Sequence, residues 1–212
     1  MTRAPSFCAV ILAAGESTRM GTDKALLPWP PYRAGMQPGG RTFLSAAIQS
    51  LNAFSDLVIV VAGKNEPQLA PVVYTEGAFV VRNPAPERGQ FSSLQVGLQE
   101  VLNHGRDAAI VTLVDRPPVS AATLSQLGAA FEAAASGTWA VVPEHGGKHG
   151  HPVLLDREMI AVFLNAPASG NAQEIEHQYQ QHIQYVAVDD PAIAMNVDTP
   201  QDYEALVAPP LK

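Results

Sequence analysis

Five short apolar segments along the chain predict buried β-strands. They are nearly uninterrupted runs rich in Val, Ile and Leu, a composition typical of strands that are covered on both faces. The segments are Phe7–Ala14, Leu57–Ala62, Ala78–Arg82, Ala108–Val114 and Trp139–Val142.

Longer stretches lie between these runs, and their apolar residues are spaced by three and four positions, as in amphipathic helices. Alternating strands and helices predict a mostly parallel sheet joined by crossover connections. The pattern therefore predicts an α/β fold with one doubly wound sheet and helices on both faces. With no visible linker or repeat, we expect a single domain over residues 1–212. The predicted helices are Thr42–Phe54, Ser92–Asn103, Ala121–Ala135 and Asp156–Leu164.

Local signals refine this pattern. Ser92 with Gln95 and Asn171 with Glu174 have the spacing of a capping box. Thr199-Pro200 places a cap before a proline at the first helical position. The segment 28–40 is rich in proline and glycine, which predicts an exposed, irregular excursion from the domain.

The charge balance limits the classes of partner. Thirteen Lys and Arg against 20 Asp and Glu give a formal net charge of −7, whereas proteins that bind nucleic acids or anionic membranes need a basic surface. The run Phe7–Ala14 is too short to cross a bilayer and lacks the features of a secretory signal. We therefore expect a cytoplasmic protein that binds neither nucleic acid nor membranes. Cys8, the only cysteine, lies in this run and is predicted to be buried and unreactive.

The turn after the first predicted strand is where a sheet of this kind binds ligands. It reads LAAGESTRMGTDK over residues 12–24. Its small residues let backbone N–H groups approach an anion, and Arg19 and Lys24 add positive charge. The spacing of Gly15, Gly21 and Lys24 is not that of a P-loop, and no G-x-G-x-x-G is present. A phosphate cradle fits; the alternative is a turn whose basic residues only face water.

A carboxylate follows the fourth predicted strand. Asp115 comes directly after the run Ala108–Val114, so it is expected at the same edge of the sheet as the glycine loop. An ionised carboxylate at this place suits magnesium, which proteins usually hold with one or two carboxylates plus substrate phosphates. The alternative is a cap at the strand end before Pro117-Pro118.

Five motifs, in order, resemble the MobA-like nucleotidyltransferase superfamily, and among its members most resemble the molybdenum cofactor cytidylyltransferases. They span nearly the whole chain: the glycine loop at 12–24, NP through GQFSSL at 83–94, VDRP at 114–117, GHPVL at 150–154 and NVDTP at 196–200. The resemblance implies a Rossmann-like nucleotide-diphospho-sugar transferase fold. It also implies transfer of CMP from CTP to molybdopterin carrying molybdenum, with release of pyrophosphate.

The resemblance also implies roles for single residues. The implied catalytic residues are Lys24, Arg19 and Asp115. The implied ligands of a divalent cation, Mg²⁺ or alternatively Mn²⁺, are Asp115 and Asp198. The alternative for Asp198 is that it assists the cap of the helix that begins after Thr199 and binds no metal. The nucleotide-binding residues would be Leu12, Ala13, Ala14, Gly15, Ser17, Arg19, Gly21, Lys24, Asn83 and Ser93, and the acceptor-binding residues Gly89, Gln90, Arg116 and His151.

Two positions depart from the family pattern: Gln90 replaces a usual methionine, and Arg116 replaces the glutamine of the nearest relatives. Arg116 would favour a more anionic acceptor or pair with Asp115. The sequence LAAG favours CTP, because the guanylyl-transferring relatives usually read LAGG. Three alternatives stay open: GTP as donor, a sugar or polyol phosphate as acceptor, and a non-catalytic carrier of the molybdenum cofactor. A molybdenum hydroxylase would receive the product.

No strong general base is evident, and none is needed, because an acceptor phosphate is already ionised at neutral pH. Catalysis can then rest on positioning and charge neutralisation. His145, His149 and His151 form an H-x3-H-x-H cluster, but without cysteines it is a weak zinc signal. Six of the 13 basic residues are predicted at the ligand-binding edge, which would reverse the acidic net charge locally: Arg19, Lys24, Arg82, Arg88, Arg116 and Lys148.

Overall fold

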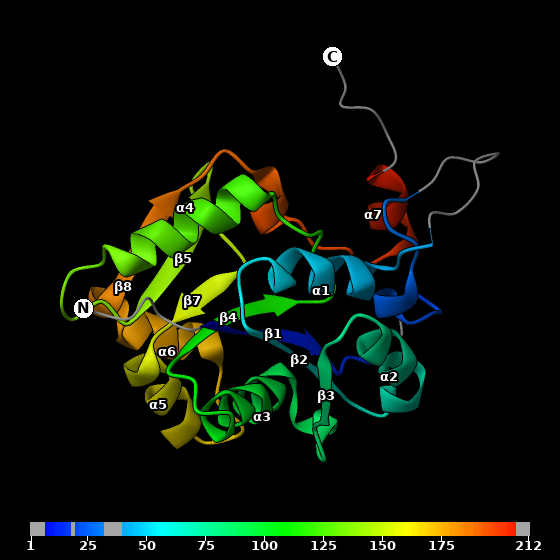
Figure 1. The fold of residues 1–212 in the computed structure, drawn as a ribbon, viewed down its shortest axis with the longest axis horizontal. Coiled ribbons are helices and arrows are strands. Elements are labelled where there is room, and N and C mark those ends of the chain that lie inside the picture. The colour runs from blue at the N-terminus through cyan, green and yellow to red at the C-terminus, as the bar shows by residue number, and fades with distance from the viewer. Residues whose placement is uncertain (1–6, 18–19, 32–39, 207–212) are drawn as a thin grey trace.

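The computed structural model describes residues 7–17, 20–31 and 40–206, and it has one eight-stranded sheet at its centre (Figure 1). The strand order is β3-β2-β1-β4-β7-β5-β6, with β8 paired to β5. β1, β2, β3 and β4 are mutually parallel neighbours, β5 and β8 form a further parallel pair, and β7 runs antiparallel between β4 and β5. The strands are β1 (Phe7–Ala13), β2 (Leu57–Ala62), β3 (Phe79–Arg82), β4 (Ala108–Leu113), β5 (Ala140–His145), β6 (Lys148–His149), β7 (Val153–Leu155) and β8 (Ile183–Ala187).

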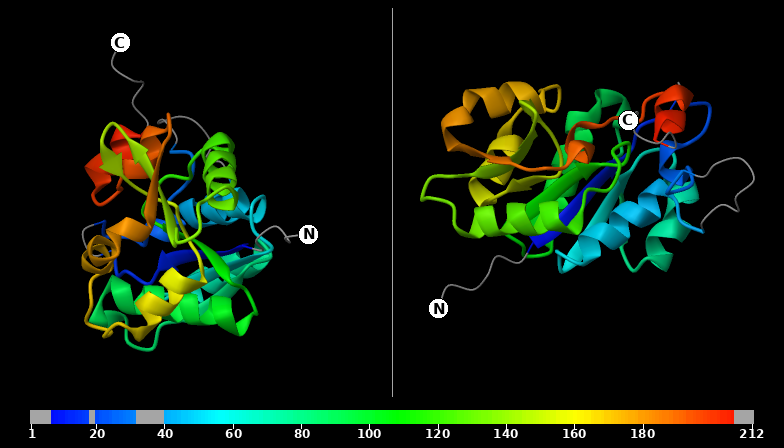
Figure 2. Two further views of the ribbon diagram at one scale, coloured as in Figure 1. Left: turned by 90° about the vertical axis from the view of Figure 1, so that its left-hand side faces the viewer. Right: turned by 90° about the horizontal axis from the view of Figure 1, so that it is seen from above.

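Helices cover both faces of the sheet (Figures 1 and 2). One core cluster packs α1 (Phe43–Asn52), α2 (Glu66–Thr75) and α4 (Ala121–Glu132) against one face. The other cluster packs α3 (Gln90–Asn103), α5 (Arg157–Asn165) and α6 (Ala172–Gln178) against the opposite face. The last helix is α7 (Pro200–Ala205). The predicted doubly wound, mostly parallel α/β fold is confirmed.

The central strand β1 shows why both faces are apolar. All seven of its residues are buried. Because side chains alternate across a strand, Ala9 and Ile11 belong to the first core cluster, whereas Cys8, Val10 and Leu12 belong to the second. Cys8 is fully buried as predicted, and burial raises the pKa of its thiol to about 12.

A close approach between α3 and the sheet requires glycine. A Cβ atom on Gly97 would lie 2.5 Å from Cγ1 of Val10. The helix therefore carries a glycine in its middle despite the low helix propensity of that residue, because any side chain there would push α3 away from β1.

The predicted strands and helices all form, with ends shifted by a few residues. The apolar pattern did not indicate α2 or the short strands β6, β7 and β8, since these elements are short, partly exposed or interrupted by proline. Thr199 caps α7 with Pro200 at its first position, as predicted. Of segment 28–40, the described flanks are joined by a bridge between Pro28 and Thr42; residues 32–39 lie outside the described residues.

The predicted capping box of Ser92 and Gln95 is wrong. α3 begins at Gln90, and Gly89 occupies the cap position with φ of 95°. Ser92 lies within the first turn and donates to the Gly89 carbonyl at 2.7 Å. Gln95 instead donates to the carbonyls of Phe163 and Ala166, so a tertiary contact replaces the expected local one. Asn171 caps α6 by accepting from the Gln173 amide, without a box.

Within the part of the chain that the structure describes, no helix has the length and apolar character needed to span a membrane.

Candidate active site

Two adjoining cavities open at the carboxyl ends of β1 and β4. The first has a volume of about 290 Å³ and is lined by the glycine loop, the start of α3 and the end of β4. The second has a volume of about 810 Å³ and extends from the same place toward α6. Both cavities share seven lining residues, namely Leu12, Lys24, Gly89, Gln90, Leu113, Asp115 and Asp198. The predicted edge of the sheet is therefore hollow, and one cluster of charges lies between its two chambers.

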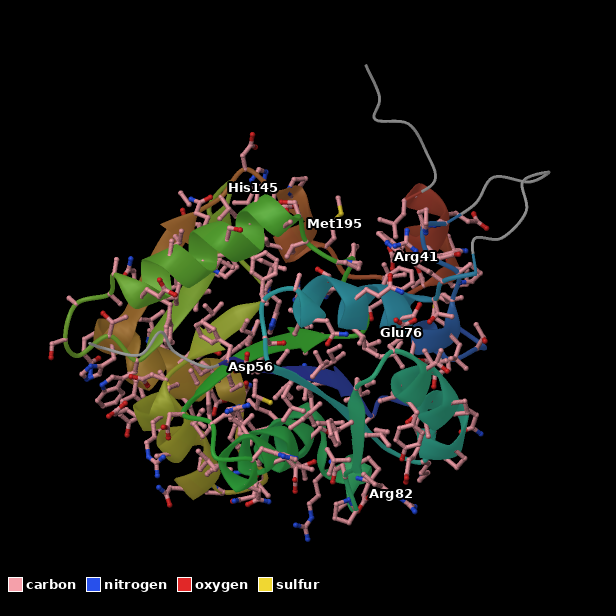
Figure 3. The ribbon with its side chains drawn as sticks, viewed as in Figure 1. Arg41, Asp56, Glu76, Arg82, His145 and Met195 are labelled. Atoms are coloured by element: carbon pink, nitrogen blue, oxygen red, sulfur yellow. The ribbon has the colours of Figure 1, made fainter. Side chains whose placement is uncertain are left out.

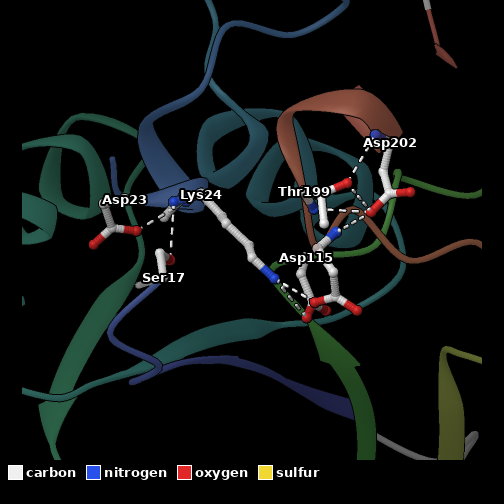
Figure 4. Close-up of polar contacts among 8 residues, drawn as sticks. Ser17, Asp23, Lys24, Asp115, Thr199 and Asp202 are labelled. Carbon is white, nitrogen blue, oxygen red and sulfur yellow. Dashed lines mark hydrogen bonds and ion pairs between the residues drawn. The ribbon is translucent and has the colours of Figure 1, made fainter. Parts of the chain in front are cut away.

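Lys24 lies between two aspartates in this shared cluster (Figure 4). Its Nζ atom is 2.6 Å from Oδ1 of Asp198 and 3.6 Å from Oδ2 of Asp115. The Lys24 side chain is only 12% exposed, so water screens these charges weakly. Lys24 comes from the loop after β1, Asp115 follows β4, and Asp198 precedes α7. The fold thus joins three distant segments that the sequence singled out separately.

The two carboxylates fit a divalent cation. Both contact the same ammonium group, so they are close enough to share one cation. Oδ1 of Asp115 is buried and has no hydrogen-bond partner among the described residues, which leaves its lone pairs free for a ligand. The part of the chain described contains no group of three or more metal-binding side chains. Two carboxylates completed by substrate oxygens and water are the usual set for Mg²⁺.

Ser17 shapes the glycine loop. It has φ of 48°, an uncommon left-handed conformation for a residue other than glycine. Its Oγ atom accepts a hydrogen bond from the Lys24 amide at 3.1 Å (Figure 4). Its carbonyl accepts one from the Met20 amide at 3.0 Å. These bonds close the loop upon itself and set where the Lys24 side chain begins.

Asn65 is a residue of this site that the motifs did not indicate. Its side-chain amide donates to the Ala13 carbonyl at 2.9 Å and to Oδ2 of Asp23 at 2.6 Å. Asp23 in turn caps the short 3-10 helix that carries Lys24, by accepting from the Ala25 amide. Asn65 precedes α2, a helix that the apolar pattern also missed. Its polar role could be found only once the end of β2 was known to lie beside the glycine loop.

Asp202 holds the segment that carries Asp198. Its Oδ2 atom accepts hydrogen bonds from the amides of Asp198 and Thr199 and from Oγ1 of Thr199 (Figure 4). These bonds to Thr199 and Asp198 lower the pKa of the Asp202 carboxyl. Thr199 and Asp202 thus form the capping box of α7, whereas the Asp198 side chain contacts Lys24.

Asn83 and Ser93 form a buried polar layer beneath the first cavity. The Asn83 side-chain amide donates to the hydroxyls of Ser92 and Ser93, both at 2.9 Å, and its oxygen accepts from the Ala85 amide. Ser93 lines the first cavity, whereas Asn83 is 2% exposed and lines neither. Asn83 thus positions the start of α3 from below.

Arg116 and His151 lie on the wall of the second cavity. Nη1 of Arg116 and the amide of His151 both donate to the Ile193 carbonyl at 3.0 Å. Arg116 and Asp115 are not in direct ion-pair contact, although the charge of Asp115 raises the pKa of the guanidinium, which burial lowers by more. Burial, followed by the charge of Arg116, lowers the pKa of His151 to about 4, so this imidazole is neutral at neutral pH.

Several predicted residues lie elsewhere. Ala13 and Gly21 line neither cavity, and Arg19 lies outside the described residues. His145 contacts the Val188 carbonyl and His149 contacts Glu144, so the histidine cluster has no common centre.

Of the basic residues predicted at this edge, Lys24, Arg88 and Arg116 line the second cavity. Arg82 lies at the periphery of the molecule, near Glu66 (Figure 3), and Lys148 lines neither cavity.

The family model of the MobA-like NTP transferase domain matches residues 9–184. The chain belongs to this family and is a nucleotidyltransferase. The family match thereby confirms the superfamily inferred from the five motifs.

Three curated relatives show the range within the family. A molybdenum cofactor guanylyltransferase of Xanthomonas euvesicatoria is 29% identical, over 98% of this chain and 97% of that protein. A molybdenum cofactor cytidylyltransferase of Escherichia coli is 23% identical, with 92% of each chain covered. A probable molybdenum cofactor guanylyltransferase of Rhodopirellula baltica is 32% identical over 58% of this chain, and this match spans only about half of the relative, 54%.

Solved structures support the same fold. Rv0371c from Mycobacterium tuberculosis H37Rv has a TM-score of 0.79 and 29% identity, covering 97% of this chain and 99% of its own. The structure of Rv0371c in complex with manganese has a TM-score of 0.73 and 26% identity over the same shares.

Proposed function

We propose that this nucleotidyltransferase transfers CMP from CTP to the phosphate of a molybdopterin-type acceptor and releases pyrophosphate. The observation that carries this proposal is the pair of cavities that share Lys24, Asp115 and Asp198. The first cavity, beside the glycine loop, would take the nucleotide, and the second would take the acceptor. A shared charged boundary is what a transfer between two bound phosphates requires.

The chemistry follows from this arrangement. An oxygen of the acceptor phosphate attacks the α-phosphorus of the nucleotide, a new P–O bond forms, and the bond to the β-phosphate oxygen breaks. Lys24 neutralises phosphate charge at the boundary, where its low exposure strengthens the effect. The divalent cation, held by Asp115 and Asp198, would supply further charge neutralisation at the α-phosphate. Manganese in the complex of the similar Rv0371c supports the use of such a cation.

The choice of CTP rests on Ala14. This residue lines the first cavity, and its methyl group distinguishes LAAG from the LAGG of guanylyl-transferring relatives. A cytidylyltransferase and guanylyltransferases of the molybdenum cofactor are both among the curated relatives. GTP is therefore the second candidate donor, favoured by the names of six curated relatives. Delivery of the product to a molybdenum hydroxylase stays a prediction.

A panel of nucleotides tests the proposal. The purified protein is incubated with CTP, GTP or ATP, a divalent cation and molybdopterin with or without molybdenum, and the dinucleotide product is identified by mass spectrometry. We expect a product with CTP. A product with GTP alone would make GTP, and not CTP, the donor. Nucleotide binding without any product would favour a carrier of the molybdenum cofactor.

The variant Ala14→Gly tests the basis of donor choice. We expect the ratio of kcat/KM for CTP to that for GTP to fall by about tenfold, because one methyl group discriminates within that range. The ratio is measured in one protein preparation, so a loss of folded protein cancels. An unchanged ratio would remove Ala14 from donor selection.

A further inference from the structure

Glu176 is an acidic side chain in the second cavity that no motif indicated. It lies on α6, on the side of the cavity formed by Asn171, Ala172 and Gln173. The other carboxylates that line this cavity, Asp115 and Asp198, are already engaged with Lys24. Among the residues described, Glu176 is thus the one acidic group of the cavity that lies away from the charged cluster.

The carboxylate of Glu176 is unsatisfied within the part of the chain that the structure describes. The described residues provide no hydrogen-bond donor and no cation to Glu176, and burial raises its pKa to about 7. Other partly buried carboxylates of the chain are paired: Asp190 accepts from Ser120 and Thr123, and Asp156 accepts from the Met159 amide. A half-buried acid without donors costs stability. A ligand that brings donors into the cavity would remove this cost.

The charges that line the cavity indicate how such a ligand is oriented. The basic residues Lys24, Arg88 and Arg116 line the cavity together with Asp115 and suit the phosphate of an acceptor. The carboxylate of Glu176 would repel a phosphate but would accept hydrogen bonds from N–H groups. An acceptor with a phosphate at one end and an N–H edge at the other fits this distribution of charge.

We propose that Glu176 recognises the acceptor by accepting two hydrogen bonds from a paired N–H edge, such as the amino group and ring N–H of an aminopyrimidinone. This proposal rests on the proposed function, since the pterin of a molybdopterin-type acceptor carries that edge. It makes Glu176 a specificity-determining residue, and it separates pterin acceptors from sugar or polyol phosphates. The hydroxyl groups of a sugar or polyol can donate to a carboxylate or accept from an amide, whereas a paired N–H edge only donates.

The variant Glu176→Gln tests this assignment, because it retains the shape of the side chain and replaces one acceptor oxygen with a donor. Its matched control is Glu174→Gln, which makes the same change on the same helix at an exposed residue that lines neither cavity. For wild type and both variants, the binding of metal-free molybdopterin and of CTP is measured by calorimetry, and KM and kcat are measured for transfer.

We expect Glu176→Gln to weaken molybdopterin binding and to raise its KM by about tenfold, since one acceptor oxygen is lost and a donor faces a donor. Binding of CTP should change by less than about twofold, and the melting temperature should stay equal or rise, because an unpaired buried acid is removed. Glu174→Gln should match wild type in all of these measurements.

The outcomes separate the two proposals. If wild type transfers CMP to molybdopterin and Glu176→Gln binds the acceptor equally well, the role of Glu176 is overturned and the proposed function stands. If Glu176→Gln lowers the melting temperature and weakens the binding of CTP and molybdopterin equally, Glu176 has a structural role, and its role in recognition is also overturned. If wild type binds no molybdopterin, the proposed function fails, and this inference fails with it.

Discussion

The backbone amide of Val197 donates a hydrogen bond to the backbone carbonyl of Asp115, with an N–O distance of 2.9 Å. This single bond ties the C-terminal NVDTP segment to the end of β4. Val197 is 1% exposed, so the bond is protected from water. As a result, the next residue, Asp198, lies beside Asp115 and next to Lys24.

Loss of either aspartate should weaken cation binding, because the proposed site holds the cation with both carboxylates. We expect Asp115→Asn to lower turnover by about 100-fold or more, as removal of one group that stabilises a reacting phosphate does. Asp198→Asn should have a similar effect. Free Mn²⁺ is measured by electron paramagnetic resonance alongside pyrophosphate release, so cation affinity is read independently of activity. Glu132→Gln, an exposed change on α4, is the control, and wild-type Mn²⁺ affinity in Asp115→Asn would contradict the metal site.

Asp202 is expected to act by positioning Asp198. Asp202→Ala removes the acceptor of three hydrogen bonds from Asp198 and Thr199. We expect weaker Mn²⁺ binding and a kcat lowered by about tenfold, a smaller loss than for Asp198→Asn, because the metal ligand is retained but less ordered. Thr199→Ser, which keeps the hydroxyl, should remain close to wild type. Equal Mn²⁺ affinity in wild type and Asp202→Ala would refute the positioning role.

His151 should make the protein sensitive to acid. Its pKa is about 4 in the folded protein, below its ordinary value of 6.5. Below pH 6.5 the unfolded chain therefore binds a proton that the folded protein does not, and stability is lost as the pH falls toward 4. At pH 5 this loss is at most about 2 kcal/mol. Urea unfolding of wild type and His151→Gln at pH 7.5 and pH 5 measures the difference. An identical acid loss in both proteins would show that His151 does not contribute.

Gly150 allows the wall of the second cavity to form. A Cβ atom at this position would lie 2.0 Å from the Ile193 carbonyl oxygen, which accepts from Arg116 and His151. We expect Gly150→Ala to destabilise the fold by about 2 kcal/mol or more and to raise the KM of the acceptor more than that of the nucleotide. Gly128→Ala is the control, since its Cβ meets nothing within 4 Å and alanine favours the α4 helix. Equal stability of the two variants would contradict this account.

Local sequence pattern was sufficient for much of the sheet. The pattern predicts β1 and β4 because nearly all residues in the centre of a covered sheet are apolar, and the ends of these strands locate the glycine loop and Asp115. β7 has only three residues and lies antiparallel between β4 and β5. So short a segment has no period of its own, and only pairing with its neighbours defines it as a strand.

Polar residues that act through others were harder to find. Gln95 has the spacing of a capping box relative to Ser92. Its side-chain amide instead donates hydrogen bonds to the carbonyls of Phe163 and Ala166, and no local rule predicts this contact. Asn65 and Glu176 carry no motif, and their importance comes from what the fold brings near them. The spacing of Thr199 and Asp202 did contain a capping signal that could have identified Asp202.

The sequence by itself determined the α/β class, the family and the loops that carry Lys24, Asp115 and Asp198, because burial and turn geometry impose residue types on short, contiguous segments. The tertiary structure alone decided that Lys24 and Asp198, 174 positions apart, are in contact. It also decided that two cavities share their charges and that no residue in the described part of the chain pairs with Glu176. These properties depend on distances between segments, which are set by packing across the sheet and leave no periodic trace along the chain.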